Sequence, residues 1–317
     1  MKNESRVIFS KICRLPSNYA NKSIFKNHLG ESPQTLLRQV AESKVTSLSP
    51  IDTAAILKSL IEGTNYKGIS ELRKYPLYRP VAKKLVDSIE CYRQELLSYF
   101  VLQFYKLHDI QAIKALSRLF LQREAWKSQN LSQLVEFLYY LAHHIPKEIR
   151  ASETVNAEQL LLPEKEEPTE DVNVYCEILL QLQGEVLRKV KDLRDTTLLY
   201  KLITSLSNLP KTKYTSEILA SIKDIVKVEL EKNNWSGKHL KRVIVALIDL
   251  KLVDSYMLTS ILRTLEYNQD SFDSCDIKDL LEALDIFDIQ ACNTYISLRD
   301  KLEIANHIRG KMKSLEI

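Results

Sequence analysis

The chain has 317 residues, of which 45% are hydrophobic, so it holds enough apolar material for one large core or two ordinary ones. Its 45 basic and 41 acidic residues leave a formal net charge of +4, which is too small to identify a nucleic-acid-binding protein. The six glycines and nine prolines are too few for a fold rich in tight turns, and no apolar run approaches the roughly 18 residues of a membrane span. We therefore expect a folded protein without a large sheet and without membrane insertion.

The amino-terminal 44 residues carry the whole excess of positive charge, with eight basic and three acidic residues. The stretch from Arg6 to Leu29 contains five cations and no acid, and its first part can form an amphipathic helix. Three interpretations remain open: a mitochondrial targeting segment, a retained basic arm that contacts RNA, and a solvated tail. We treat residues 1–50 as a basic N-terminal extension.

An apolar stripe typical of an amphipathic helix recurs along the rest of the chain. It places apolar residues at positions 1, 4, 5, 8 and 11, and its copies begin at Leu97, Leu131, Leu199, Leu240 and Ile277. The intervals are 34, 68, 41 and 37 residues, and the longest is twice the shortest. We therefore expect a further, degenerate copy near residues 175–182.

Several copies end in a short turn that contains an aspartate, as in the segments 106–110, 251–255 and 286–289. The aspartate side chain can cap the next helix, and second helices are expected at 110–122 and 255–265. A helical hairpin cannot bury both of its apolar faces alone, so neighbouring hairpins must stack. The sequence predicts an all-α fold, an α-solenoid of stacked helical hairpins of about 34–41 residues each that forms a right-handed superhelix.

Two polar or proline-rich breaks interrupt the helical pattern. Residues 162–171, LPEKEEPTED, should form an exposed acidic loop, and residues 67–80 contain the second break, KYPLYRP. Beyond the extension, we expect an N-terminal helical-repeat block at 51–162, an acidic linker at 163–172 and a C-terminal helical-repeat block at 173–317.

Catalytic and metal-binding motifs are hard to find. Gly63 and Gly68 have the spacing of a phosphate loop, but Ile69 stands where that loop needs a lysine. His143 and His144 are adjacent and have no cysteine near them in sequence, so they predict no metal site. We expect a protein that is not an enzyme and has no cofactor, metal or small-molecule substrate.

The cysteines and tryptophans are interpreted as packing residues. Cys13, Cys91, Cys176, Cys275 and Cys292 are widely spaced and form no CxxC pair, so we expect reduced thiols that are mostly buried. Trp126 and Trp235 lie beside basic residues, yet packing is a commoner role for tryptophan than stacking on bases.

Two segments, VIVALIDLKLVDSYMLTSIL at 243–262 and DLLEALDIFDIQA at 279–291, resemble the degenerate repeats of organellar RNA-binding proteins of the heptatricopeptide or FAST-kinase-like type. The resemblance covers residues 95–302. It implies a mitochondrial matrix protein that acts on ribosomal or messenger RNA, in some members as an architectural part of the mitochondrial ribosome. Many members end in a small α/β domain, but here the segment 302–317 has a helical pattern, so nuclease activity is not implied.

Basic clusters on the expected helices are candidates for contacts with RNA phosphates, which are electrostatic and independent of sequence. The candidate residues are Lys114, Arg118, Arg123, Arg188, Lys189, Lys191, Lys238, Lys241 and Arg242. With the resemblance, they predict a non-catalytic component of a mitochondrial ribonucleoprotein such as the mitochondrial ribosome, in contact with ribosomal RNA and neighbouring proteins. The alternative is an armadillo- or HEAT-like scaffold that binds protein and makes no contact with RNA.

Overall fold

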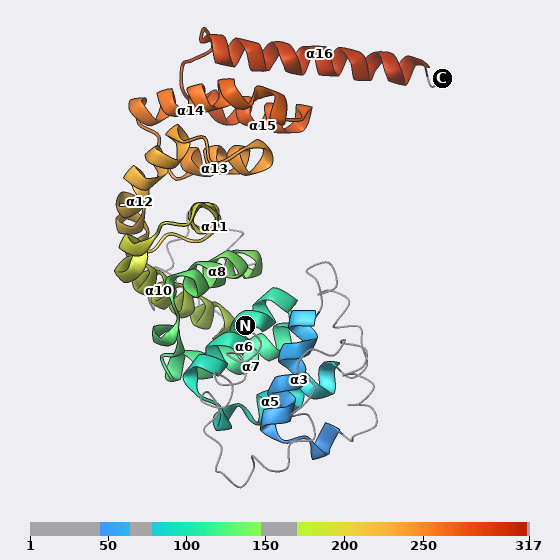
Figure 1. Ribbon diagram of the computed structural model, residues 1–317, viewed down its shortest axis with the longest axis vertical. Coiled ribbons are helices and arrows are strands. Elements are labelled where there is room, and N and C mark those ends of the chain that lie inside the picture. The colour runs from blue at the N-terminus through green and yellow to red at the C-terminus, as the bar shows by residue number, and fades with distance from the viewer. Residues whose placement is uncertain (1–44, 64–77, 147–169, 316–317) are drawn as a thin grey trace. The chain divides into compact units, whose positions relative to one another are not determined.

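The computed structural model describes residues 45–63, 78–146 and 170–315 (Figure 1). These residues form α-helices and short 3-10 helices and contain no β-strand. The chain divides into two compact units, each described separately below. Unit 1 comprises residues 1–130 and 166–181, and unit 2 comprises residues 131–165 and 182–317.

Unit 1 is built around the hairpin of α6 and α7. Its helices are α3 (Pro50–Gly63), α5 (Tyr78–Asp87), α6 (Gln94–Leu107), α7 (Ile110–Gln122) and the first part of α10 (Glu170–Lys189). Phe100, Phe104 and Phe120 are fully buried between α6 and its neighbours. The hydroxyl of Tyr78 on α5 donates to Asp109, 2.8 Å away, in the turn between α6 and α7.

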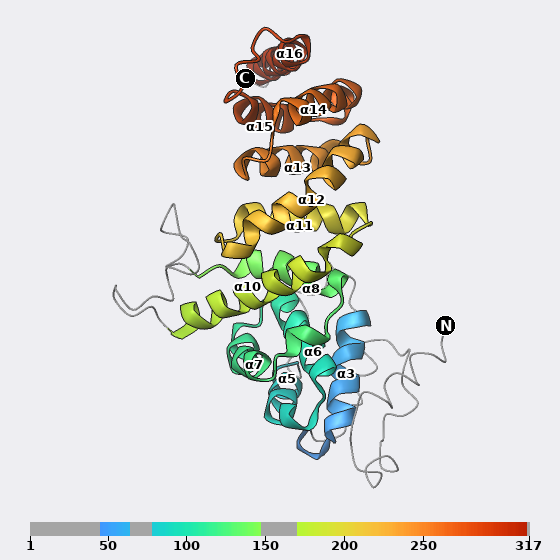
Figure 2. The same ribbon diagram turned by 90° about the vertical axis from the view of Figure 1, so that its left-hand side faces the viewer.

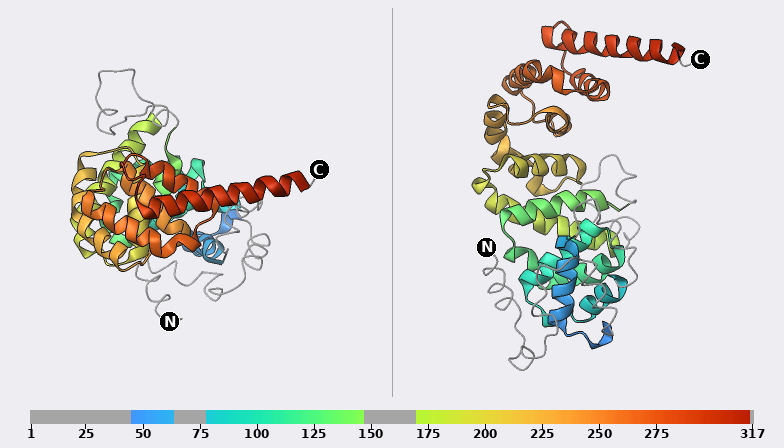
Figure 3. Two further views of the ribbon diagram at one scale, coloured as in Figure 1. Left: turned by 90° about the horizontal axis from the view of Figure 1, so that it is seen from above. Right: turned by 45° about the vertical axis from the view of Figure 1, so that its right-hand side comes forward.

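Unit 2 is a two-layered stack of hairpins. Its helices are α8 (Leu131–Leu141), the end of α10, α11 (Thr196–Asn208), α12 (Lys213–Glu231), α13 (Gly237–Asp249), α14 (Ser255–Asn268), α15 (Ser274–Leu284) and α16 (Asn293–Leu315). One layer runs α8, α11, α13 and α15, each packed on the next, and the second layer runs α12, α14 and α16 (Figure 2). α16 is longer than α15 and extends beyond it (Figure 3).

The apolar stripes predicted from the sequence coincide with the helices α6, α8, α11, α13 and α15. All five stripe residues are buried in α6 and in α13, and only Leu131 of α8 and Phe287 after α15 are partly accessible. Each stripe faces the next helix of its layer or its hairpin partner, which is how stacked repeats remove apolar area from water. The all-α fold with stacked helical hairpins is confirmed.

The long interval in the repeat does not contain an additional hairpin of the same layer. α8 packs directly on α11, so no first helix lies between them. Residues 175–182 are helical, as expected, and they belong to α10, which precedes α11 in the chain. The interval is long because the connection between α8 and α10 is long.

Aspartates cap the second helices at two of the three predicted turns. Asp109 accepts a hydrogen bond from the Ala112 amide at the start of α7, and Asp254 accepts one from the Met257 amide at the start of α14. Asp288 does not serve in this way, because α16 begins only at Asn293. The prediction that an aspartate caps the next helix was therefore wrong for the third turn.

Asp254 also joins the second-layer helices α12 and α14. Its carboxylate lies 2.8 Å from Lys223 Nζ and 3.6 Å from Lys227 Nζ, both on α12. The hydrogen bond from Lys223 and the one from the Met257 amide lower the pKa of Asp254 to about 2. One side chain thus caps α14 and anchors it to the preceding hairpin.

The packing residues behave only partly as expected. Trp126 and Trp235 are both buried, which confirms their packing role, and the Trp126 ring lies 6.0 Å from Phe120 between centroids. Cys91 and Cys275 are exposed, so the expectation that the cysteines are mostly buried was wrong for these two. Cys91 ends the 3-10 helix Ile89–Cys91, and Cys275 is the second residue of α15.

Several sequence-based expectations concern residues outside the described part of the chain. The basic segment 6–29, Cys13, Gly68 and most of the acidic stretch 162–171 lie there. Among the described helices, none is both long enough and apolar enough to cross a bilayer. Glu170 and Asp171, from the end of the acidic stretch, form the first turn of α10.

Candidate functional site

Unit 2 contains a groove of about 760 Å³ that crosses the first-layer helices α8, α11, α13 and α15. Its lining residues are Tyr139, Ala142, His143, Tyr200, Thr204, Ser205, Ser207, Asn208, Lys241, Arg242, Val245, Ala246, Asp249, Asp279, Glu282 and Ala283. Residues from four successive helices therefore share one surface, although they lie up to 144 positions apart in the sequence. This volume lies within the range of known ligand-binding sites.

The groove exists because each first-layer helix has a second, polar stripe beside its apolar one. On α11, Tyr200, Thr204 and Asn208 follow at four-residue spacing and line the groove, whereas Leu199, Leu202 and Leu206 are buried in the stack. A four-residue spacing keeps side chains on one face of a helix. Burial of the apolar stripe fixes the rotation of each helix about its axis, and this rotation places the polar residues in the groove.

One part of the groove is aromatic and cationic. The Arg242 guanidinium of α13 donates a hydrogen bond from Nη1 to the Tyr200 hydroxyl of α11 over 3.2 Å. His239 packs edge-on against the Tyr200 ring, with centroids 4.9 Å apart. Arg242 makes no ion pair with a carboxylate among the described residues, so most of its N–H donors remain available to a ligand.

A different part of the groove is acidic. Asp249, the last residue of α13, makes no hydrogen bond or ion pair within the described part of the chain, and partial desolvation raises its pKa. Glu282 of α15 also lines the groove, and it forms an exposed ion pair with Lys278 on the same helix, at 3.4 Å. Both carboxylates are acceptors that a ligand's cation or N–H group can engage.

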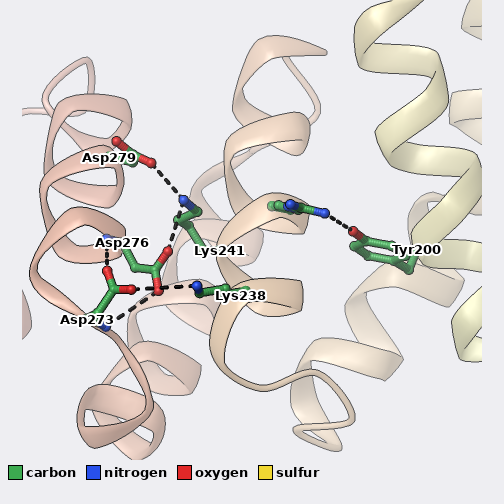
Figure 4. Close-up of polar contacts among 7 residues, drawn as sticks. Tyr200, Lys238, Lys241, Asp273, Asp276 and Asp279 are labelled. Atoms are coloured by element: carbon green, nitrogen blue, oxygen red, sulfur yellow. Dashed lines mark hydrogen bonds and ion pairs between the residues drawn. The ribbon is translucent and has the colours of Figure 1, made fainter. Parts of the chain in front are cut away.

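Lys241 connects α13 to α15 at the groove edge (Figure 4). Its Nζ lies 3.0 Å from Asp276 Oδ1 and 2.7 Å from Asp279 Oδ2. Asp276 is buried and belongs to the capping box that starts α15, in which Asp273 accepts a hydrogen bond from the Asp276 amide. The two carboxylates raise the pKa of Lys241, which keeps this lysine charged and held in the protein.

The charges of the groove are mixed and do not favour a polyanion. Lys241 and Arg242 are its cations, and three carboxylates, on Asp249, Asp279 and Glu282, face the same surface. Lys241 is already neutralised by two aspartates. The groove therefore presents one available guanidinium and a larger number of acidic oxygens.

Most of the basic residues predicted to contact RNA are engaged within the protein. In unit 1, Lys114 and Arg118 of α7 form ion pairs with Asp171 and Glu170 of α10, and all four side chains are exposed. Arg123, at the end of α7, donates to the Tyr92 carbonyl at 3.4 Å. These three residues serve the contacts of α7 with its neighbours.

In unit 2, Arg188 and Lys189 of α10 both pair with Glu185 on the same helix, at 2.5 Å and 3.0 Å. Lys191 has no carboxylate partner among the described residues and lies outside the groove. Lys238 makes an exposed pair with Asp273 at 3.7 Å. Of the six candidates in this unit, the structure brings only Lys241 and Arg242 into the groove.

The structure offers no support for a metal or nucleotide site in the residues that it describes. No cluster of three or more histidine, cysteine or carboxylate side chains could hold a metal ion there. His143 packs against Tyr139, with ring centroids 5.0 Å apart, and its Nδ1 lies 2.8 Å from the Tyr139 carbonyl. Gly63 ends α3, and its expected phosphate-loop partner Gly68 lies outside the described residues.

Sequence reasoning missed the acidic and amide residues of the groove. Asp249 and Asn208 are the last residues of α13 and α11, and a polar residue there reads as an ordinary helix end. A signal existed in the spacing, because Arg242 and Asp249 are seven residues apart and therefore share a helix face. A search for polar residues at a fixed offset from each apolar stripe could have found both.

Comparison with known proteins adds no identification: no family model and no curated protein matches the chain.

Proposed function

We propose that the protein is a non-catalytic helical-repeat scaffold that binds a segment of a partner protein in the groove of unit 2. The observation that carries the proposal is the composition of this groove. The groove is lined by tyrosine and histidine rings, hydroxyl and amide groups, one available guanidinium and the carboxylate of Asp249, which is unpaired among the described residues. A polypeptide offers matching apolar, donor, acceptor and charged groups, and aromatic and arginine side chains are enriched at protein interfaces.

A nucleic acid is a poorer match for the same groove. RNA presents a phosphate at every nucleotide, and its affinity depends on cations that neutralise these phosphates. Asp249, Asp279 and Glu282 would face the phosphates across the groove, where like charges repel. Because Lys241 is held by Asp276 and Asp279, Arg242 is left as the one available cation beside the carboxylates of Asp249 and Glu282 in this groove.

An RNA-associated role in a mitochondrial ribonucleoprotein, such as the mitochondrial ribosome, is the second candidate function. The observation in its favour is a set of cations without a carboxylate partner among the described residues. Arg123 and Arg194 donate to backbone carbonyls, and Lys191 has no carboxylate partner there. They are therefore available for phosphate contacts. Such contacts would lie outside the groove, so this role predicts salt-sensitive RNA binding that is indifferent to changes in the groove.

A groove-filling substitution tests the leading proposal. Val245 lies on the groove side of α13, and Val245→Arg places a long charged side chain in the space for a ligand. Val228→Arg on α12 is the matched control, because Val228 is 43% exposed and does not line the groove. The full chain, tagged and recovered from its native cell under gentle lysis, is analysed by gradient sedimentation and mass spectrometry, with and without ribonuclease.

The proposal expects a protein partner that stays bound after ribonuclease treatment, is lost with Val245→Arg and is retained with Val228→Arg. Loss of all co-sedimenting protein after ribonuclease would favour the RNA-associated role instead. In that case, labelled single-stranded RNA should bind the purified chain, and Lys191→Ala with Arg194→Ala should weaken binding and reduce its salt dependence.

A further inference from the structure

The groove is electrically asymmetric along α13. Arg242 lies in the second turn of this helix and Asp249 is its last residue. The Asp249 carboxylate has no hydrogen bond or ion pair within the described part of the chain, and Arg242 is engaged only by the Tyr200 hydroxyl. Both charged groups therefore remain to be satisfied from outside the fold.

The α13 backbone reinforces this asymmetry. The aligned peptide dipoles of a helix favour negative charge at its N-terminal end and positive charge at its C-terminal end. A ligand cation beside Asp249, the last residue of α13, is favoured by this field. Glu282, which lines the groove on α15, adds a second carboxylate one turn beyond Asp279.

The separation of the two charges fits an extended chain. Seven residues of α-helix rise about 10 Å, and an extended segment in the polyproline II conformation covers about 3.1 Å per residue and returns to the same face every third residue. The distance from Arg242 to Asp249 along α13 is therefore spanned by about three residues of a polyproline II segment, whose side chains at these two positions point the same way. A partner segment would meet both charges with an acidic and a basic side chain three positions apart.

The α11 side of the groove is suited to the backbone of such a segment. The Thr204 and Ser207 hydroxyls donate to the carbonyls of Tyr200 and Thr204, at 2.8 Å and 3.1 Å. The Asn208 amide donates through Nδ2 to the Thr204 carbonyl at 2.6 Å. With their hydrogens used inside the helix, these side chains offer oxygen acceptors to the groove, and an extended peptide backbone has N–H donors to meet them.

We propose that the groove of unit 2 recognises an extended protein segment in which an acidic side chain binds Arg242 and a basic side chain, three residues away, binds Asp249. This inference rests on the proposed function and specifies the partner's chemistry. The groove selects a segment that carries both charges over segments that carry two charges of one sign.

Peptides with defined charges test the selection. The probes are three fluorescein-labelled ten-residue peptides on one serine, glycine and proline background, with Asp-x-x-Lys, Asp-x-x-Asp or Lys-x-x-Lys at the centre. Binding to the full chain is measured by fluorescence anisotropy at low and at physiological salt. The Asp-x-x-Lys peptide should bind the unmodified protein at least about fivefold more tightly than either of the others.

Charge reversal on α13 should redirect the preference. Arg242→Glu should make Lys-x-x-Lys the tightest of the three peptides, and Asp249→Lys should make Asp-x-x-Asp the tightest. Arg263→Glu on α14 and Asp224→Lys on α12 are matched controls, because both residues are exposed and neither lines the groove. These controls should keep the preference of the unmodified protein, and circular dichroism checks that all variants are folded.

The possible results separate this inference from the proposed function. Equal affinity for the three peptides, no binding of any, or a preference unchanged by Arg242→Glu would overturn the charge-pair inference. If a cellular protein partner were still lost specifically with Val245→Arg, the scaffold function would stand with a different ligand chemistry. If Val245→Arg and Val228→Arg behaved alike, the scaffold function itself would fail.

Discussion

The contact between α13 and α15 yields a quantitative prediction, because two lysines of α13 pair with three aspartates at and near the start of α15 in different surroundings. Lys241 pairs with Asp276 and Asp279, and the side chains of Lys241 and Asp276 are only 18% and 4% exposed. Lys238 pairs with Asp273 at 3.7 Å, and these side chains are 71% and 55% exposed. Replacing each lysine by methionine retains the aliphatic stem and removes only the charge.

Lys241→Met leaves the buried Asp276 carboxylate without its cation. Breaking a fully buried pair costs about 3–5 kcal/mol, and access of water to Lys241 and Asp279 reduces this here to about 2 kcal/mol. Lys238→Met removes an exposed pair and should change the free energy of unfolding by less than about 0.5 kcal/mol. The large difference arises from the burial of one aspartate.

Urea unfolding measures both effects in a Trp126→Phe background, in which the fluorescence of the buried Trp235 reports on unit 2. The midpoint should fall clearly for Lys241→Met and remain nearly unchanged for Lys238→Met. Equal losses for the two variants, or a loss below about 0.5 kcal/mol for Lys241→Met, would refute the reasoning from burial.

Three further predictions concern single sites. The carboxyl of Asp254, followed by NMR, should titrate with a pKa of about 2. Its contribution to the free energy of unfolding is therefore present above its ordinary pKa and is lost as the pH falls through about 2. A pKa near 3.8 would contradict this. Gly237→Ala should lower the free energy of unfolding by about 1 kcal/mol in thermal or urea unfolding, because Gly237 has a φ of +49°; an increase in stability would contradict it. Burial raises the pKa of Cys176 to about 11, so iodoacetamide at pH 8 should modify Cys91 and Cys275 and spare Cys176, as read by mass spectrometry; equal modification would contradict the packing.

The repeat architecture could be predicted from the sequence because it depends on a strong periodic signal. The apolar stripes that begin at Leu97, Leu199 and Leu240 have a helical period, and all their residues are buried. Burial of such a stripe is the main favourable contribution to the stacking of helices. The turn aspartates Asp109 and Asp254 could be predicted for a similar reason, since an N-cap is a local interaction within four residues.

The candidate site could be predicted only in part, because its residues are brought together by stacking. Lys241 and Arg242 were singled out as cations, but their partners Asp276 and Tyr200 lie on other hairpins. Whether a surface lysine is available or neutralised depends on such partners. The sequence alone therefore overestimates how much positive charge is free to bind RNA, and it gives no weight to the unpaired Asp249.

The most direct test of the account is site-specific photo-cross-linking from the groove in the native cell. A benzoylphenylalanine side chain at position 245 lies on the groove side of α13, and the same group at position 228 on α12 is the control. The account predicts a covalent adduct from position 245 that protease removes and ribonuclease leaves intact, with little adduct from position 228. Cross-linking of position 245 to RNA, or equal yields of the same protein adduct from both positions, would contradict a groove that binds a partner protein.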